Sequence, residues 1–124
     1  MKGIKDIGYQ TFTMWMSGML KKPLREQILE TVASYHKMPI SELCTPKRNQ
    51  SIVKVRQQVM YFLRAETDLS LKEIGSVFGG KHHTTTMHAI KMVKDRAETD
   101  KIYRAELSDL IPLIQALTSN NKSK

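Results

Sequence analysis

The sequence predicts an all-α fold that contains a helix-turn-helix. Apolar residues recur at three- and four-residue spacing through most of the chain, and no segment alternates in the way that a strand does. Gly79-Gly80 separates two such segments, and the second begins with short polar side chains. Two helices joined by a few residues that contain glycine are typical of a helix-turn-helix. A chain of 124 residues is expected to form one domain with a modest core.

The two ends of the chain differ in composition from the part between them. Residues 1–22 hold three glycines, four methionines and the only tryptophan, and we interpret them as an N-terminal arm. Residues 23–118 carry the helical spacing and are predicted to form the domain. Residues 119–124 are polar and are predicted to be a disordered tail.

Two long helices are predicted ahead of the glycine turn. The first begins at Pro23, which suits a first helical turn, and Pro39 ends it. Residues 40–43 are predicted to form a short turn, and a basic loop without an acid follows at 46–51. The second helix is expected over about 52–67. The residues expected to be apolar contacts are Leu24, Ile28, Val32 and Tyr35 in the first helix and Val55, Val59, Phe62 and Leu63 in the second.

Three more helices are predicted after these two. Ser70-Leu71-Lys72-Glu73 forms a capping box that opens a short helix, and Gly79-Gly80 ends it. The next helix is expected over about 83–98 and the last over about 100–117, where Pro112 would kink the helix or shift its boundary. The residues expected to face inward are Met87, Ile90, Val93 and Ala97, then Leu107, Leu110 or Ile111, Ile114 and Leu117.

The charge of the chain favours a polyanionic partner. Lysine and arginine number 20 against 12 acids, which gives a net charge of +8. Nucleic acid or an anionic surface fits this excess, although a basic protein without such a partner fits it as well. Cys44 is the only cysteine, so we expect no disulfide, a buried thiol and a cytoplasmic location. No stretch approaches the roughly 20 apolar residues of a membrane span, so a membrane partner is not expected.

The same region also resembles other kinds of site. Residues 75–82 nearly match the phosphate-binding pattern G-x-x-x-x-G-K-[ST], but His82 replaces the hydroxyl that would bind Mg²⁺ and no strand precedes the segment. His82, His83 and His88 lack the nearby cysteine or carboxylate that would complete a tetrahedral metal site. Nothing resembles a paired-carboxylate or nucleophile–base site. We therefore expect no nucleotide, metal or other cofactor and no enzymatic activity.

The segment around the glycine turn carries a family signature. It is Ile74-Gly75-x-x-Phe78-Gly79-Gly80-Lys81-x-His83-Thr84-Thr85-x-x-His88-Ala89, preceded by Arg56-Gln57-x-x-Met60-Tyr61, Arg64, Thr67 and Ser70-Leu71. This pattern closely resembles the DNA-binding domain of the bacterial replication initiator DnaA, and the resemblance spans roughly residues 24–117. It implies a Trp-repressor-like helical domain that binds double-stranded DNA at short A/T-rich boxes.

The resemblance assigns base-reading positions. They fall on His83 and Thr84, where threonine offers a methyl group to thymine and histidine can donate to a purine. His82 precedes them at the helix start. Leu71 matches a residue that approaches thymine methyl groups, with packing in the capping turn as the other interpretation. Lys54 matches the minor-groove reader beside the basic loop.

The resemblance also assigns positions at the DNA backbone. Thr85 and His88 match positions near the phosphates, although N-capping is the other interpretation for Thr84 and Thr85. For the loop cations, a solvated charged surface is the other interpretation. The residues expected at phosphates are Thr85, His88, Lys81, Lys72, Arg64, Arg56, Arg48 and Lys47.

Five positions depart from the family pattern. Lys54 stands where arginine is typical, and lysine is more strongly hydrated in a narrow minor groove. His82 replaces an aspartate and so offers a donor that could address guanine. Lys72 replaces a proline, Thr86 an apolar residue and Met92 a basic one. We expect the binding mode to be kept and the preferred DNA sequence to differ.

The expected function is sequence-specific binding to duplex DNA, as in recognition of replication origins. The initiator's strand-rich ATPase domain has no room in this chain, so we expect a standalone paralogue, a phage or mobile-element relative, or a regulator that occupies initiator-like boxes. The alternative is an adaptor that contacts a protein or a membrane through residues 1–22. The sequence does not indicate an oligomeric state.

Overall fold

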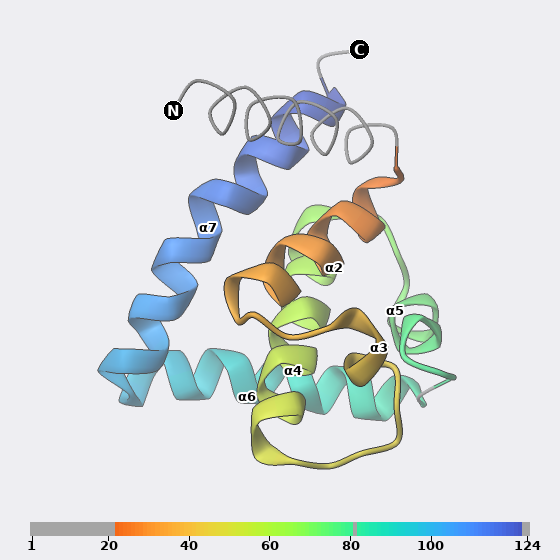
Figure 1. Ribbon diagram of the computed structural model, residues 1–124, viewed down its shortest axis with the longest axis vertical. Helices are drawn as coiled ribbons and strands as arrows, with labels where there is room; N and C mark the ends of the chain where they lie inside the picture. Colours follow the sequence, from red (N-terminus) through yellow and green to blue (C-terminus); the bar gives the residue numbers. More distant parts are fainter. Residues whose placement is uncertain (1–21, 81, 123–124) are drawn as a thin grey trace, which may run out of the picture.

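The computed structural model describes residues 22–80 and 82–122, and every regular element in these ranges is a helix, as predicted (Figure 1). Helix α6 lies across one end of the domain, α4 crosses it, and α7 turns back from the end of α6 alongside α2. Because α4 packs against α2, α3, α5, α6 and α7, it forms the centre of the domain. The helices are α2 (Leu24–Tyr35), α3 (Ile40–Leu43), α4 (Gln50–Glu66), α5 (Leu71–Val77), α6 (His83–Thr99) and α7 (Lys101–Lys122).

One apolar core joins all six helices. Burial of apolar area at about 25 cal/mol per Å² is what holds such short helices in place. The core also contains two fully buried glutamines, Gln27 on α2 and Gln58 on α4, which the apolar spacing does not predict. The buried apolar residues are Ile28, Val32, Ala33, Leu43, Ile52, Val55, Val59, Met60, Phe62, Leu63, Ile74, Phe78, Ala89, Val93, Tyr103, Leu107, Leu110 and Ile114.

The first connection is tighter than the sequence predicts. Helix α2 ends at Tyr35, four residues before Pro39, because Lys37 takes a left-handed conformation with φ of 55°. Residues 40–43, predicted as a turn, form one turn of helix with the buried Leu43. Helix α4 begins at Gln50, two residues earlier than expected. These shifts leave residues 44–49 as the loop that connects the end of α3 to the start of α4.

The helix-turn-helix forms as the sequence predicts. The Ser70 hydroxyl accepts from the Glu73 amide (3.1 Å), and the Glu73 carboxylate accepts from the Ser70 amide (2.9 Å). Gly79 and Gly80 have φ of 85° and 78°, which L residues rarely adopt, so the chain can reverse between α5 and α6. Phe78 is buried in the core. Residues 75–80 are therefore a helix end with a core anchor, not an open phosphate loop.

Helix α6 is rotated relative to the prediction. Met87 was expected to face inward, but 52% of its surface is exposed. The buried residues are Thr86, Ala89 and Val93, while Ile90 and Ala97 are half-buried. Small side chains at 86 and 89 let the helix backbone lie close to α4, whereas the apolar spacing favoured the larger Met87. The rotation presents a different set of side chains to solvent.

Helix α7 is longer than predicted. It continues through Lys122, so residues 119–122 are helical and the expected disordered tail at 119–124 is wrong for these four residues. Pro112 lies inside the helix. Leu110 is fully buried and Ile111 is 39% exposed, which settles the choice between them. The predicted N-terminal arm falls outside the described residues, apart from Lys22.

Two smaller expectations concern the surface. Cys44 is exposed, contrary to the predicted buried thiol, and its Sγ lies 3.9 Å from the Val77 carbonyl oxygen. It follows α3 on the loop side, where no apolar element covers it. Within the described part of the chain, no helix is long and apolar enough to cross a membrane.

Candidate nucleic-acid interface

The start of α6 exposes a compact group of polar side chains. His83, Thr84, Thr85 and His88 all face solvent, whereas Thr86 between them is fully buried. The positive φ values at Gly79 and Gly80 let the chain reverse between α5 and α6, and the start of α6 lies below α5 in Figure 1. A helix whose first turns carry exposed donors and acceptors can reach base edges in the major groove. The structure therefore brings four predicted site residues together.

His82 caps this helix. Its Nδ1 accepts from the Thr84 amide at 3.2 Å and lies 2.8 Å from the Thr84 hydroxyl oxygen. An accepting Nδ1 places the ring proton on Nε2, so a donor remains free on the outer side of the ring. The His82 and His83 ring centroids are 4.4 Å apart. The N-cap of α6 is thus His82, so the alternative interpretation of Thr84 and Thr85 as N-cap residues is wrong.

The other predicted residues of the turn differ in exposure. Leu71 is half-buried at the start of α5, and Lys72 beside it is exposed. Arg64 is exposed at the end of α4, where its guanidinium donates to the Leu69 carbonyl at 3.3 Å. Lys81 lies outside the described residues. Lys72 and Arg64 therefore supply exposed positive charge close to the start of α5.

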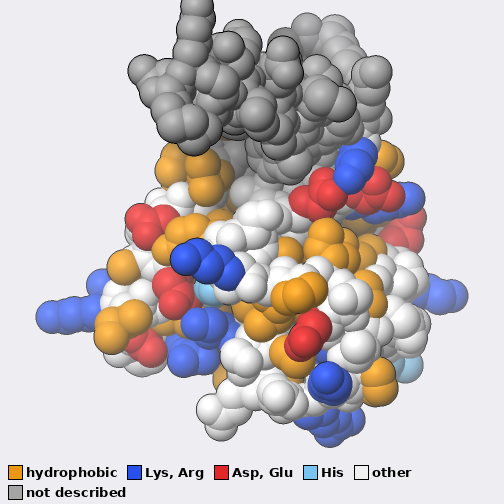
Figure 2. All heavy atoms as spheres, in the orientation of Figure 1, with side chains coloured by type: hydrophobic (Ala, Val, Ile, Leu, Met, Phe, Trp, Pro, Cys, Tyr) orange, Lys and Arg blue, Asp and Glu red, His pale blue; other side chains and the backbone are white. Residues whose placement is uncertain are grey.

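The basic loop lies beside the start of α6. Lys47 and Arg48 are both exposed, and Arg48 lines a cavity of about 420 Å³ together with Thr85 and His88. The loop and the start of α6, far apart in the sequence, therefore face one shared hollow. Lysine and arginine side chains project around this part of the molecule in Figure 2, with fewer acidic ones between them.

Arg56 has a different role from the one predicted. It is only 7% exposed, and its guanidinium donates to the carbonyl oxygens of Leu43 (3.0 Å), Thr45 (2.9 Å) and Lys47 (3.3 Å). Burial lowers the pKa of this group, but a guanidinium stays charged at neutral pH. We correct the expectation that Arg56 holds a phosphate: its donors are directed at the loop backbone, and it fixes the loop that carries Arg48.

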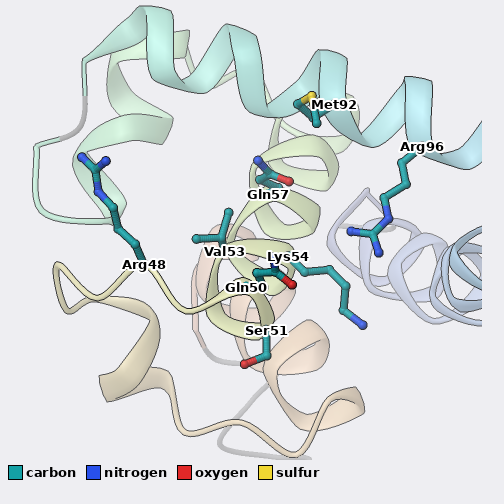
Figure 3. A pocket seen from close by; sticks show the side chains of 8 residues that line it. All are labelled: Arg48, Gln50, Ser51, Val53, Lys54, Gln57, Met92 and Arg96. Carbon is teal, nitrogen blue, oxygen red and sulfur yellow. The ribbon is translucent and has the colours of Figure 1, made fainter.

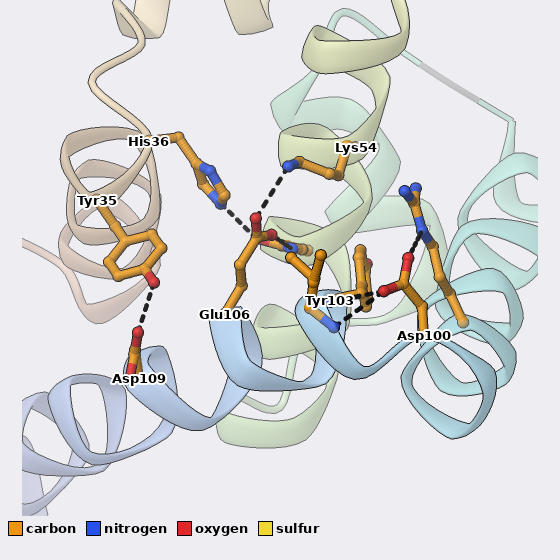
Figure 4. Close-up of polar contacts among 10 residues, drawn as sticks. Tyr35, His36, Lys54, Asp100, Tyr103, Glu106 and Asp109 are labelled. Atoms are coloured by element: carbon orange, nitrogen blue, oxygen red, sulfur yellow. Dashed lines mark hydrogen bonds and ion pairs between the residues drawn. The ribbon is translucent and has the colours of Figure 1, made fainter.

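Lys54 is held by a carboxylate. Its Nζ lies 3.2 Å from Glu106 Oε2 on α7, and the other oxygen of Glu106 accepts from Gln58 at 3.3 Å (Figure 4). Gln58 in turn bonds the His36 ring at 2.7 Å. A lysine expected to enter a minor groove is thus engaged across the domain. To contact DNA, Lys54 would have to give up its ion pair with Glu106.

One buried polar atom has no partner. The Thr86 hydroxyl is fully buried and makes no hydrogen bond to the described residues. A hydroxyl is costly to bury in this way. For metals, no group of three or more possible ligands occurs among the described residues.

Sequence reasoning missed several residues beside this face. Gln57 on α4 and Met92 and Arg96 on α6 line a second hollow next to the loop. A signal for the α6 residues exists: His88, Met92 and Arg96 recur every four residues, which places them along one side of a helix. The family signature ends at Ala89, but the same four-residue spacing continues beyond it and would have predicted that Met92 and Arg96 lie on the same side of the helix as His88.

Comparison with known proteins agrees with this geometry. The family described as bacterial dnaA protein helix-turn-helix matches residues 25–93, more than half of the chain. The chromosomal replication initiator protein DnaA of Oenococcus oeni is 42% identical over 83 residues, which cover 67% of this chain and 18% of that protein. The chain therefore spans less than a fifth of the relative's length. With its helix-turn-helix and matching signature, the chain belongs to the bacterial DnaA helix-turn-helix family.

Proposed function

We propose that this protein binds double-stranded DNA in a sequence-dependent way, with the start of α6 in the major groove. The observation that carries the proposal is the exposed group His83, Thr84, Thr85 and His88 on the second helix of a helix-turn-helix. The family and the 42% identical initiator support it. The DNA sequences we propose are short boxes of the kind that the initiator family reads.

The preferred box is proposed to differ from that of the family. The free Nε2–H of His82 offers a donor where the family has an acceptor, so guanine replaces cytosine as the favoured contact. Lys54 contributes less to minor-groove reading than an arginine would, because it is strongly hydrated and paired with Glu106. The major-groove contacts of His83 and Thr84 then dominate the specificity.

Selection from random duplex DNA at fixed, near-physiological salt tests this proposal. We expect enrichment of a short motif, and His83→Ala should lower the ratio of specific to random affinity by about 5- to 150-fold, the equivalent of 1–3 kcal/mol for one base contact. Lys47→Ala is the matched control, because it removes an exposed loop charge and should weaken both duplexes alike.

Two results would contradict the proposal. One is the recovery of no motif by the selection. The other is an equal loss on specific and scrambled duplexes for His83→Ala and Lys47→Ala, which would remove His83 from base reading. Salt must be held constant throughout, since the sequence-independent affinity of so basic a chain changes steeply with it.

A further inference from the structure

A second hollow extends the proposed DNA-binding surface along α6. It has a volume of about 610 Å³ and lies between the start of α4 and the middle of α6. In Figure 3, Arg48 lies at one end and Arg96 at the other, with Gln57 and Met92 between them. Three of its lining residues are cations (Arg48, Lys54 and Arg96), and none of the described residues that line it is acidic.

This hollow is continuous with the one at the start of α6. Both are lined by Arg48, Val53 and Gln57, so together they form one groove. On α6 the groove runs from Thr85 to Arg96, which at 1.5 Å per residue is about 16 Å. That length exceeds the spacing of successive phosphates, which rise by about 3.4 Å along one DNA strand. We call it the α4–α6 groove.

Two of the three cations of the groove, Arg48 and Arg96, are only loosely engaged, whereas Lys54 is paired with Glu106. Arg48 makes no ion pair with the described residues. Arg96 lies 3.6 Å from the Asp100 carboxylate and 4.8 Å from the centre of the Tyr103 ring, with half of its side chain exposed. Exposed ion pairs of this kind contribute about 0–1 kcal/mol, so a phosphate can replace the carboxylate at little cost.

We infer that the α4–α6 groove holds the phosphates of the DNA strand that flanks the major groove, with Arg96 as a phosphate contact at its far end. The inference rests on the proposed function for the placement of DNA at α6. Its ligand is the sequence-independent backbone. Gln57 and Ser51 add neutral donors to the groove, while Met92 contributes an apolar wall without charge. Arg96 therefore adds affinity without adding specificity.

Salt dependence of binding tests the groove. We would measure the affinity of the full chain for its selected duplex and for a scrambled duplex between about 50 and 200 mM salt. Arg96→Gln should weaken both duplexes by the same factor and reduce the salt slope by about 0.9, the value of one lost phosphate contact. Met92→Lys adds a cation one turn from Arg96 and should strengthen both duplexes and steepen the slope by a similar amount.

Lys94→Gln is the matched control. It removes the same charge from the same helix, but a two-residue offset turns Lys94 to the opposite side of α6 from Arg96 and Met92. Its effect on the slope should be clearly smaller. Equal slopes for Arg96→Gln and Lys94→Gln, or no gain from Met92→Lys, would overturn the inference. Because Met92→Lys leaves Arg96 in its contacts with Asp100 and Tyr103, its gain cannot arise from lost folding.

Two further arms separate the possible failures. Displacement of duplex by inorganic phosphate at constant ionic strength would show a site for a free anion and overturn the assignment to DNA. If selection recovers no motif but the slopes change as expected, the proposed sequence specificity fails and the groove stands. If a motif is recovered and the salt slopes do not change, the assignment of phosphates to the groove is contradicted while the proposed sequence-dependent binding is kept.

Discussion

The start of α6 and the loop at residues 44–49 both present nitrogen and oxygen donors to solvent, yet they are held in different ways. At α6, His82 caps its own helix through Thr84, and the exposed residues follow from the helical repeat. In the loop, the conformation depends on Arg56, which comes from α4 and donates to two loop carbonyls, those of Thr45 and Lys47, and to the carbonyl of Leu43 at the end of α3. The first region is therefore organised locally and the second by a distant side chain.

This difference indicates which cations are available to bind DNA and which are already bound within the fold. Four basic residues in or beside the loop were expected at DNA, and Lys47, like Arg48, is exposed. Arg56 is buried and donates its hydrogen bonds to backbone carbonyls, and Lys54 is paired with Glu106 on α7. A long cationic side chain can serve the fold or the ligand, and its neighbours in space decide which.

Arg56→Ala gives the largest expected effect on the comparison. It leaves two loop carbonyls and the last carbonyl of α3 without their charged donor, so we expect the free energy of unfolding to fall by roughly 2–3 kcal/mol. Urea unfolding measures it. Lys47→Ala removes the same charge from the exposed loop surface and should change stability by less than about 0.5 kcal/mol. An unchanged stability for Arg56→Ala would mean that the loop, like α6, is organised locally.

Glu106→Gln should release Lys54. The variant removes the carboxylate 3.2 Å from Nζ but keeps a side chain that can bond Gln58. Since a partly exposed ion pair is worth up to about 1 kcal/mol, we expect duplex affinity to rise about two- to fivefold. Fluorescence anisotropy at fixed salt measures this. Glu98→Gln, which removes an exposed acid on α6 outside this network, is the control. An equal gain in affinity from both variants would mean that the change in net charge, and not the release of Lys54, causes the effect.

The smallest expected effect concerns the capping box, the local counterpart of the Arg56 contacts. Hydrogen bonds from Ser70 lower the pKa of the Glu73 carboxyl. A carboxyl whose folded pKa is depressed stabilises the fold above its unfolded pKa, and this contribution is lost as the pH falls through the folded value. Glu73→Gln should therefore be less stable than the parent at neutral pH. The gap in thermal midpoint should close in acid below the usual range of a glutamate.

A constant gap down to low pH would contradict this, because it would assign the effect to packing rather than to the ionised carboxyl. Glu98→Gln is again the comparison, since Glu98 is exposed, no Glu98 side-chain bond is found among the described residues, and its replacement should leave the midpoint at neutral pH nearly unchanged.

Local patterns were enough to predict much of this molecule. The capping box at Ser70, the left-handed glycines at 79 and 80 and the polar start of α6 each depend on residues within one or two turns of one another. The rotation of α6 was different. Apolar spacing placed Met87 inside, but close packing against α4 selected the smaller Thr86 and Ala89.

The sequence by itself determined the all-α fold, the helix-turn-helix and the exposed polar start of α6, because capping, glycine conformation and helical repeat act over short distances. Only the tertiary structure decided the roles of Arg56, Lys54 and Arg96. Their side chains are long enough to reach other elements, and the partners they meet there come from parts of the chain far away in sequence. The α4–α6 groove exists for the same reason, since its two walls join only when the domain folds.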